Sequence, residues 1–260
     1  MSTKFNNKTV FISGASSGIG LASAHLFAKA GARLILLARR EDKLKSLAAE
    51  LNTEYNTQSL VFAADICERS AVEKICASLT SPWSGIDVLI NNAGLALGKD
   101  KAQSSLLDDW EKMIDTNIKG LFCLTHALLP NMVKRNQGHI LNLGSIAGRQ
   151  VYAGGAVYCA TKHAVKAFSD ALRYDLNGSA IRVSCIEPGM VETEFSQVRF
   201  KGDIARSEQE YIGIEVLTPE DIADAIFYCA SRPAHVNIQD ILITPTAQAS
   251  VALVHRQPKE

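Results

Sequence analysis

Apolar residues along this chain follow two alternating patterns. Short runs of consecutive apolar residues, typical of buried strands, alternate with longer stretches in which apolar residues recur at helical spacing. Strands are predicted at residues 9–13, 33–38, 60–64, 87–91, 139–143, 181–186 and 240–244. Helices are predicted from the glycine-rich turn at 14–20 to about residue 30, at 41–51, 68–79 and 156–176, and at 106–134 with an interruption near Pro130. A last helix begins where Thr218 provides an N-cap and Pro219 stands in the first turn.

The alternation of strand and helix determines the predicted fold. Successive βαβ units imply a parallel sheet covered by helices on both faces, and the crossovers are expected to be right-handed. We therefore expect a Rossmann-type, doubly wound three-layer α/β sandwich with a central, mostly parallel seven-stranded sheet, in a single domain over residues 1–260. Ligands of such folds bind beyond the carboxyl ends of the strands, so the segments that follow the strands are the candidates for function.

Composition supports one large domain and excludes few partners. The chain has 260 residues, of which 47% are hydrophobic and 21% charged, with a formal net charge of zero. This balance does not favour a nucleic-acid or anionic-membrane surface. The N-terminus lacks an apolar signal core, and no apolar run is long enough for a bilayer, so a cytoplasmic enzyme is expected. Six cysteines without a CxxC pair indicate reduced thiols, and no metal-binding spacing of histidines is present.

The turn after the first predicted strand is a candidate phosphate site. Its sequence, Gly14-Ala15-Ser16-Ser17-Gly18-Ile19-Gly20, opens a helix. Glycines allow a tight turn and close approach of the backbone, and the helix N-terminus offers free N–H groups to an anion. The spacing is G-x-x-x-G-x-G instead of the G-x-G-x-x-G fingerprint. An ordinary glycine-rich turn is the alternative, which the position directly after a strand makes less favoured.

The end of the second strand indicates which dinucleotide binds. A carboxylate at this place would bond the 2′-hydroxyl of NAD, but the strand ends in Ala38-Arg39-Arg40. Two guanidiniums suit a 2′-phosphate. Cations are mildly unfavourable at the start of a helix, which argues against a merely solvated pair. The sequence therefore predicts NADP(H).

A second constellation carries acid/base chemistry. Tyr158 and Lys162 are four residues apart at the start of a predicted helix and share one face. A phenol has a pKa of about 10, and a neighbouring ammonium lowers it, so the pair can exchange the proton that accompanies hydride transfer. Ser145 follows the fifth strand, where its hydroxyl can hold a substrate oxygen. Each feature alone also suits an ordinary helix or turn.

Taken together, the motifs resemble the short-chain dehydrogenase/reductase family over nearly the whole chain. Asn117, Ser145, Tyr158 and Lys162 match its catalytic tetrad in order. Ser13 stands where the family usually has threonine and keeps the hydroxyl. The other matching positions are the turn 14–20, Asp65, the run 91–94 (NNAG), Pro188, Gly189 and Thr193.

The resemblance implies a role for each of these residues. Tyr158 is the general acid/base, Lys162 binds the nicotinamide ribose and lowers the Tyr158 pKa, Ser145 orients the substrate oxygen, and Asn117 holds a water of a proton relay. The implied cofactor contacts are Gly14, Ser16, Ser17, Gly18, Ile19, Gly20, Arg39, Arg40, Asp65, Ile66, Asn92, Ala93, Gly94, Tyr158, Lys162, Pro188, Gly189, Val191 and Thr193. Pairing of helices across a dimer axis, within a homotetramer, is also implied.

Several stretches resemble one branch of the family, the NADP-dependent 3-hydroxy acid dehydrogenases. They are 92–98, 109–120, 152–155, 187–202 and 233–237. This branch acts on L-serine, L-allo-threonine and 3-hydroxy acids, or reduces malonic semialdehyde, so a 3-hydroxy carboxylate substrate is implied.

Such a substrate needs a cation for its carboxylate. We expect Arg199 to supply it, with Arg149 as second candidate, although either can be a solvated surface residue. Arg199 and Lys201 lie in the weakly periodic interval 188–215, which is expected to cover the pocket as a lid.

Two alternatives stay open from the sequence. The same chemistry could act on another carbonyl, such as a 3-oxoacyl thioester. A non-catalytic NADP-binding protein on this fold is disfavoured, because all four tetrad positions are filled.

Overall fold

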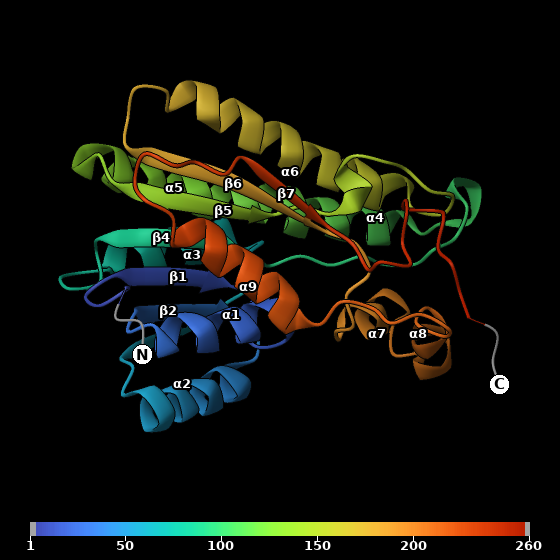
Figure 1. Cartoon of the computed structure of the whole chain (residues 1–260), viewed down its shortest axis with the longest axis horizontal. Coiled ribbons are helices and arrows are strands. Elements are labelled where there is room, and N and C mark those ends of the chain that lie inside the picture. The colour runs from blue at the N-terminus through green and yellow to red at the C-terminus, as the bar shows by residue number, and fades with distance from the viewer. Residues whose placement is uncertain (1–3, 258–260) are drawn as a thin grey trace.

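Seven parallel strands form one central sheet in the order β3–β2–β1–β4–β5–β6–β7 (Figure 1). The computed structural model describes residues 4–257. The strands are β1 (Thr9–Ser13), β2 (Arg33–Ala38), β3 (Ser59–Ala63), β4 (Ile86–Asn91), β5 (Gly138–Leu143), β6 (Ile181–Pro188) and β7 (Asp240–Ile243). The order reverses direction between β1 and β4, so the doubly wound Rossmann-type prediction is confirmed.

Helices cover both faces of the sheet and give three layers. They are α1 (Gly18–Lys29), α2 (Glu41–Tyr55), α3 (Arg69–Ser78), α4 (Leu107–Ile114), α5 (Leu121–Arg135), α6 (Ala156–Asp175), α7 (Phe195–Arg199), α8 (Ile204–Gln209) and α9 (Pro219–Ala230). Val10 and Ile12 of β1 pack on the face of the sheet that α1, α2 and α9 cover. Phe11, between them, packs with the side of α3, α5 and α6. The alternation follows from the two-residue period of a strand, which buries successive side chains on opposite faces.

The predicted interruption near Pro130 is wrong. Helix α5 runs through Pro130, and the irregularity lies earlier, where residues Asp115–Gly120 form a π-helical turn between α4 and α5. One proline removes a single backbone hydrogen bond, and the turns on either side carry the helix across it. Helix α2 also continues beyond its predicted end, to Tyr55, and ends where Asn56 adopts a left-handed conformation (φ 53°), which asparagine tolerates.

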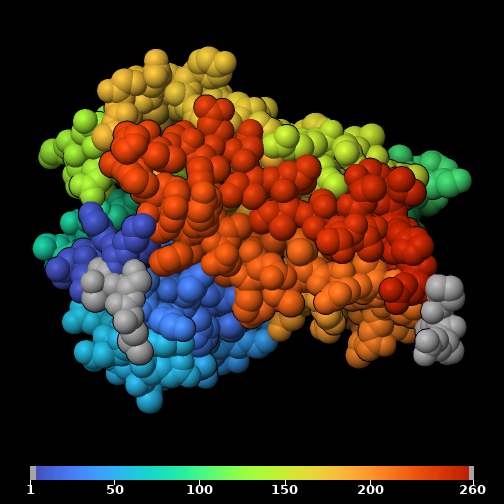
Figure 2. All heavy atoms as spheres, in the orientation of Figure 1, coloured from blue at the N-terminus to red at the C-terminus, as the bar shows by residue number. Residues whose placement is uncertain are grey.

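The segment between β6 and α9 contains the short helices α7 and α8. With five and six residues they are too short to show a helical period. The chain after β7 lies beside this segment (Figure 2), and Arg256 donates to the carbonyls of Glu210 (2.8 Å) and Ile212 (2.5 Å). Helix α9 begins as predicted, with Thr218 as N-cap, Pro219 in the first turn and a capping box completed by Asp221.

Within residues 4–257, no helix combines the length and the apolar character needed to span a bilayer.

Candidate active site

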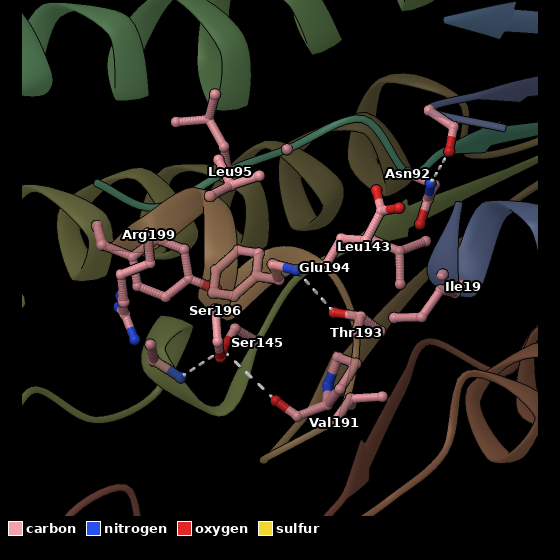
Figure 3. Close-up of a pocket in the computed structure, with 18 of the residues that line it drawn as sticks. Ile19, Asn92, Leu95, Leu143, Ser145, Val191, Thr193, Glu194, Ser196 and Arg199 are labelled. Atoms are coloured by element: carbon pink, nitrogen blue, oxygen red, sulfur yellow. Dashed lines mark hydrogen bonds between the residues drawn. The ribbon is translucent and has the colours of Figure 1, made fainter. Parts of the chain in front are cut away.

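A cavity of about 760 Å³ opens at the carboxyl ends of the strands. Its walls come from the turn after β1, the ends of β2 to β6, the start of α6, the segment after β6 and the C-terminal chain. Figure 3 shows Ile19 and Asn92 toward one end and Ser145 and Arg199 toward the other. This location matches the expectation for a doubly wound fold.

The turn after β1 is built for a close backbone approach. Gly14 has φ +68° and Gly18 φ +52°, both in the left-handed region. A Cβ on Gly20 would lie 2.3 Å from the Gly14 carbonyl oxygen, so no larger residue fits there. Within residues 4–257, the Ser17 side chain does not cap α1 and the first turn of α1 contains no acidic residue, so its N–H groups have no partner within the helix. These features fit a pyrophosphate of a dinucleotide.

Ser13 ties this turn to the loop after β4. Its hydroxyl accepts hydrogen bonds from the N–H groups of Asn92 and Ala93, both at 3.1 Å. The Asn92 amide donates to the carbonyls of Ser13 (3.0 Å) and Gly14 (3.1 Å). The serine hydroxyl therefore fixes two walls of the cavity relative to each other.

The two predicted phosphate-binding arginines lie beside the turn. Arg40 donates from Nε to Ser16 Oγ (3.2 Å) and from Nη2 to Ser17 Oγ (2.7 Å). Arg39 is more exposed and lies 4.0 Å from the Asp65 carboxylate. Both arginines line the cavity, and the other predicted cofactor contacts line it too: Gly14, Ser16, Ser17, Gly18, Ile19, Asp65, Ile66, Asn92, Ala93, Gly94, Tyr158, Lys162, Pro188, Gly189, Val191 and Thr193. Gly20 supports the turn from behind, as its contact with Gly14 shows.

Tyr158, Lys162 and Ser145 come together at the other end of the cavity. All three are buried, with 7 to 9% of their surface exposed. Lys162 Nζ donates to the Leu143 carbonyl at 2.8 Å and lies 5.9 Å from the centroid of the Tyr158 ring. Ser145 Oγ is held by the N–H of Ala147 at 3.1 Å. The Tyr158 phenol, the Lys162 ammonium and the Ser145 hydroxyl are thus buried together at this end of the cavity.

Burial sets the protonation of this group. It raises the pKa of the Tyr158 phenol above its usual value, and the Arg199 cation and the Ser145 hydroxyl offset that effect only in part. Burial also lowers the pKa of Lys162 to about 8. Arg199 is a cation that lowers the Tyr158 pKa, and the expectation that Lys162 lowers it as well stays a prediction.

Asn117 lies in the π-helical turn and is buried. Its amide oxygen accepts from the N–H of Leu95 at 2.8 Å, and its nitrogen donates to the Leu95 carbonyl (2.8 Å) and Thr161 Oγ1 (3.0 Å). The side chain therefore joins the loop after β4 to α6 through Thr161, which lies three residues after Tyr158 and directly before Lys162. Single π turns often occur at functional sites, but periodicity cannot reveal them in a sequence.

Arg199 ends α7 directly beside Tyr158. Its guanidinium carbon lies 5.2 Å from the centroid of the Tyr158 ring and 5.7 Å from that of Tyr152, whose hydroxyl it contacts. Its buried Nε has no hydrogen-bond partner within residues 4–257. The Arg199 side chain lines the cavity beside the candidate proton donor (Figure 3).

The structure does not support Arg149 as the second cation of the pocket. Its Nε donates to Glu187 at 2.7 Å, and Glu187 has no exposed surface. Among the described residues, Arg149 is not part of the cavity wall. Because a buried carboxylate needs a counter-ion, the Arg149 guanidinium stays paired with Glu187 and is not directed to a ligand in the cavity. Lys201 likewise pairs with Asp109, at 2.8 Å.

Sequence reasoning missed three residues of the cavity wall. Tyr152 contacts Arg199, Gln248 accepts from the Met190 N–H at 2.9 Å, and Glu194 binds Arg40. Tyr152 lies in a stretch that the resemblance already marked. Gln248 and Glu194 carry no local signal, since each reaches the cavity through a contact distant in sequence.

Comparison with known proteins settles the class. A family model described as short chain dehydrogenase matches residues 8–203. The chain belongs to the short-chain dehydrogenase family.

Three similar proteins show which enzymes of this family the chain resembles. An NADP-dependent 3-hydroxy acid dehydrogenase of Escherichia coli is 48% identical over 250 residues, covering 95% of this chain and 99% of that protein. A serine 3-dehydrogenase of Agrobacterium fabrum is 44% identical over 241 residues, covering 93% and 95%. The solved closed form of serine dehydrogenase complexed with NADP⁺ has a TM-score of 0.89 at 47% identity and covers 96% of this chain and 100% of that chain.

Proposed function

We propose that this chain is an NADP(H)-dependent oxidoreductase that interconverts a 3-hydroxy acid and its 3-oxo acid or semialdehyde. The substrate class is that of L-serine, L-allo-threonine and 3-hydroxypropionate. The observation that carries the proposal is the Arg199 guanidinium, which lines the cavity with its central carbon 5.2 Å from the centroid of the Tyr158 ring. The relatives named for 3-hydroxy acids and serine support the same substrate class.

In this proposal the cofactor extends along the cavity, from the turn after β1 to the end that holds Tyr158. Arg39, Arg40 and the serines of the turn suit the 2′-phosphate, the N-terminus of α1 suits the pyrophosphate, and Lys162 suits the nicotinamide ribose. Pro188, Gly189, Val191 and Thr193 complete the nicotinamide end. When bound, the cofactor accepts or supplies the hydride, and the chain provides position and proton transfer.

Each catalytic side chain has one task in this proposal. Tyr158 exchanges the proton of the substrate hydroxyl, and Ser145 binds the same oxygen and stabilises the charge that develops on it. Lys162 stabilises the deprotonated phenol. Asn117 keeps the loop after β4 against α6 and holds the relay water that the family resemblance implies.

Arg199 gives the pocket its preference for acids. A guanidinium binds a carboxylate through two parallel hydrogen bonds. Held above Tyr158, it would orient a carboxylate two carbons away from the reacting carbon of a 3-hydroxy acid. The segment 188–215 carries Arg199, so we also infer that it acts as a lid that closes over the substrate.

Initial rates across a substrate panel test this proposal. With NADP⁺, we expect turnover of L-serine, L-allo-threonine and 3-hydroxypropionate. With NAD⁺, activity should fall at least about tenfold, since a charged pair at the 2′-phosphate contributes more than about 1.4 kcal/mol. Activity on a 3-oxoacyl thioester, with none on hydroxy acids, would instead support the alternative function, in which the enzyme reduces another carbonyl substrate.

We also propose that the protein is a cytoplasmic homotetramer. Leu107 and Ile114 of α4 and Tyr174 of α6 leave 36 to 84% of their surface exposed. Exposed apolar side chains on these helices suit pairing with a second copy. Light scattering of the purified chain should give four times the mass of 28.1 kDa, and a monomer would contradict the proposal.

A further inference from the structure

Glu194 directly precedes α7, and its side chain binds the cations at the phosphate end of the cavity. Its Oε2 accepts from Arg40 Nη1 at 2.7 Å, and its Oε1 accepts from Lys43 Nζ at 2.9 Å. Both contacts join positions about 150 residues apart in sequence. The carboxylate therefore pairs with the two cations that lie where β2 leads into α2.

The same guanidinium has few donors left. Its Nε and Nη2 bind Ser16 Oγ at 3.2 and 3.0 Å, and Nη2 also binds Ser17 Oγ. Glu194 holds the third nitrogen, Nη1. A phosphate that binds Arg40 through a bidentate contact needs two of these nitrogens. A doubly charged phosphate beside an ionised carboxylate is also repelled.

We propose that Glu194 is an internal competitor of the cofactor's 2′-phosphate: its carboxylate holds Arg40 and Lys43 and yields the Arg40 contact when the phosphate binds. Glu194 then weakens NADP(H) binding and leaves NAD(H) binding unaffected, so it limits how strongly the site prefers the phosphorylated cofactor. The proposal rests on the assignment of Arg40 to the 2′-phosphate made above.

The competitor is charged throughout the working pH range. Partial burial alone would raise the pKa of Glu194, but hydrogen bonds from Lys43, Arg40 and Ser17 outweigh that effect and lower it to about 2. The charge of Glu194 therefore stays constant over this range, and only substitution removes it.

The test is Glu194→Gln, measured as cofactor dissociation constants by isothermal titration calorimetry. The amide keeps the shape and removes the charge. We expect the Kd for NADP⁺ to fall by about fivefold, the value of one or two partly exposed ion pairs. The Kd for NAD⁺, which lacks the 2′-phosphate, should stay within about twofold, the noise of a surface substitution.

Glu192→Gln is the matched control. It changes the net charge of the chain equally, two residues away, at an exposed side chain. The Kd for NADP⁺ should not change. If Glu194→Gln does not fold, Glu194→Asp withdraws the carboxylate by one methylene and should lower the Kd for NADP⁺ in the same direction.

Three results overturn the proposal. A higher Kd for NADP⁺ in Glu194→Gln would mean that the carboxylate holds Arg40 in its binding position. An equal change for both cofactors would mean a general effect on the turn. An unchanged Kd for NADP⁺ would mean that carboxylate and phosphate do not meet.

Arg40→Gln separates this proposal from the cofactor assignment. If it raises the Kd for NADP⁺ at least tenfold and spares NAD⁺, Arg40 binds the 2′-phosphate whatever Glu194 does. If it changes neither, the assignment of Arg40 fails, and with it the basis for competition.

Discussion

At the scale of single residues, the predicted site residues line one cavity, apart from Gly20, Asn117 and Arg149. Tyr158, Lys162 and Ser145 follow from their places after known turns and strands. Arg149 lies outside the cavity wall because it pairs with Glu187. Glu187 lies on a strand whose inward face cannot be read from the sequence around residue 149. The sequences around Arg199 and Arg149 do not indicate which of the two faces the pocket, and only their tertiary contacts distinguish them.

Replacement of Arg199 by alanine tests the cation of the pocket. The KM for 3-hydroxy acids should rise about 10- to 100-fold, which corresponds to the loss of a charge-assisted hydrogen-bonded pair. The KM for uncharged alcohols should change far less. Steady-state kinetics on both substrate types measures the difference.

Lys201→Ala is the control for that variant. It removes a cation two residues away that pairs with Asp109, at 2.8 Å, and should leave both KM values unchanged. An equal effect of Arg199→Ala on acids and alcohols would rule out its role toward the carboxylate.

The buried Lys162 makes a prediction about stability and pH. Burial lowers its pKa from the usual 10.5 to about 8, so between these values the unfolded chain binds more protons than the folded one. The lysine's cost to stability is full below about pH 8 and disappears as pH rises through 10.5. Relative to Lys162→Met, the wild type should gain about 2 kcal/mol of unfolding free energy between about pH 7 and pH 9.5. Urea unfolding at each pH measures it, and a constant difference would refute it.

At the scale of elements, the sequence predicted every strand within two residues at either end. Apolar runs mark buried parallel strands well because both faces are covered. The two short helices α7 and α8 and the π turn at Asp115–Gly120 were missed, since none is long enough to show a period. These irregular elements carry Arg199 and Asn117, so function is concentrated where periodicity gives least information.

The ion pair of Arg149 and Glu187 tests how β6 is held at its carboxyl end. Arg149→Met leaves Glu187 buried without its counter-ion and should lower the free energy of unfolding by about 2 kcal/mol near neutral pH. The double variant Arg149→Met/Glu187→Gln should recover most of that loss. Thermal or urea unfolding measures both variants.

The kinetic behaviour of Arg149→Met separates structure from substrate binding. Its KM for hydroxy acids should match the wild type, because the side chain faces Glu187 and not the cavity. A KM increase like that expected for Arg199→Ala would indicate that Arg149 does bind the substrate carboxylate.

At the scale of the whole molecule, the topology explains why distant motifs meet. Parallel strands bring the segments after β1, β2, β4, β5 and β6 to one edge, and the strand order places the turn of β1 beside the loop of β4. The C-terminal chain closes the far side through Gln248 and Arg256. This last contact was not predictable, because it depends on where the chain turns after β7.

The most direct test of the account is Tyr158→Phe, which removes the one hydroxyl assigned to proton transfer. Hydride transfer should be followed in a single turnover with a 3-hydroxy acid and NADP⁺, and NADPH binding measured on the same preparation. We expect turnover to fall by at least about a hundredfold, the usual contribution of a positioned acid/base, while the Kd for NADPH changes little. Substantial turnover with intact NADPH binding would contradict the role given to Tyr158.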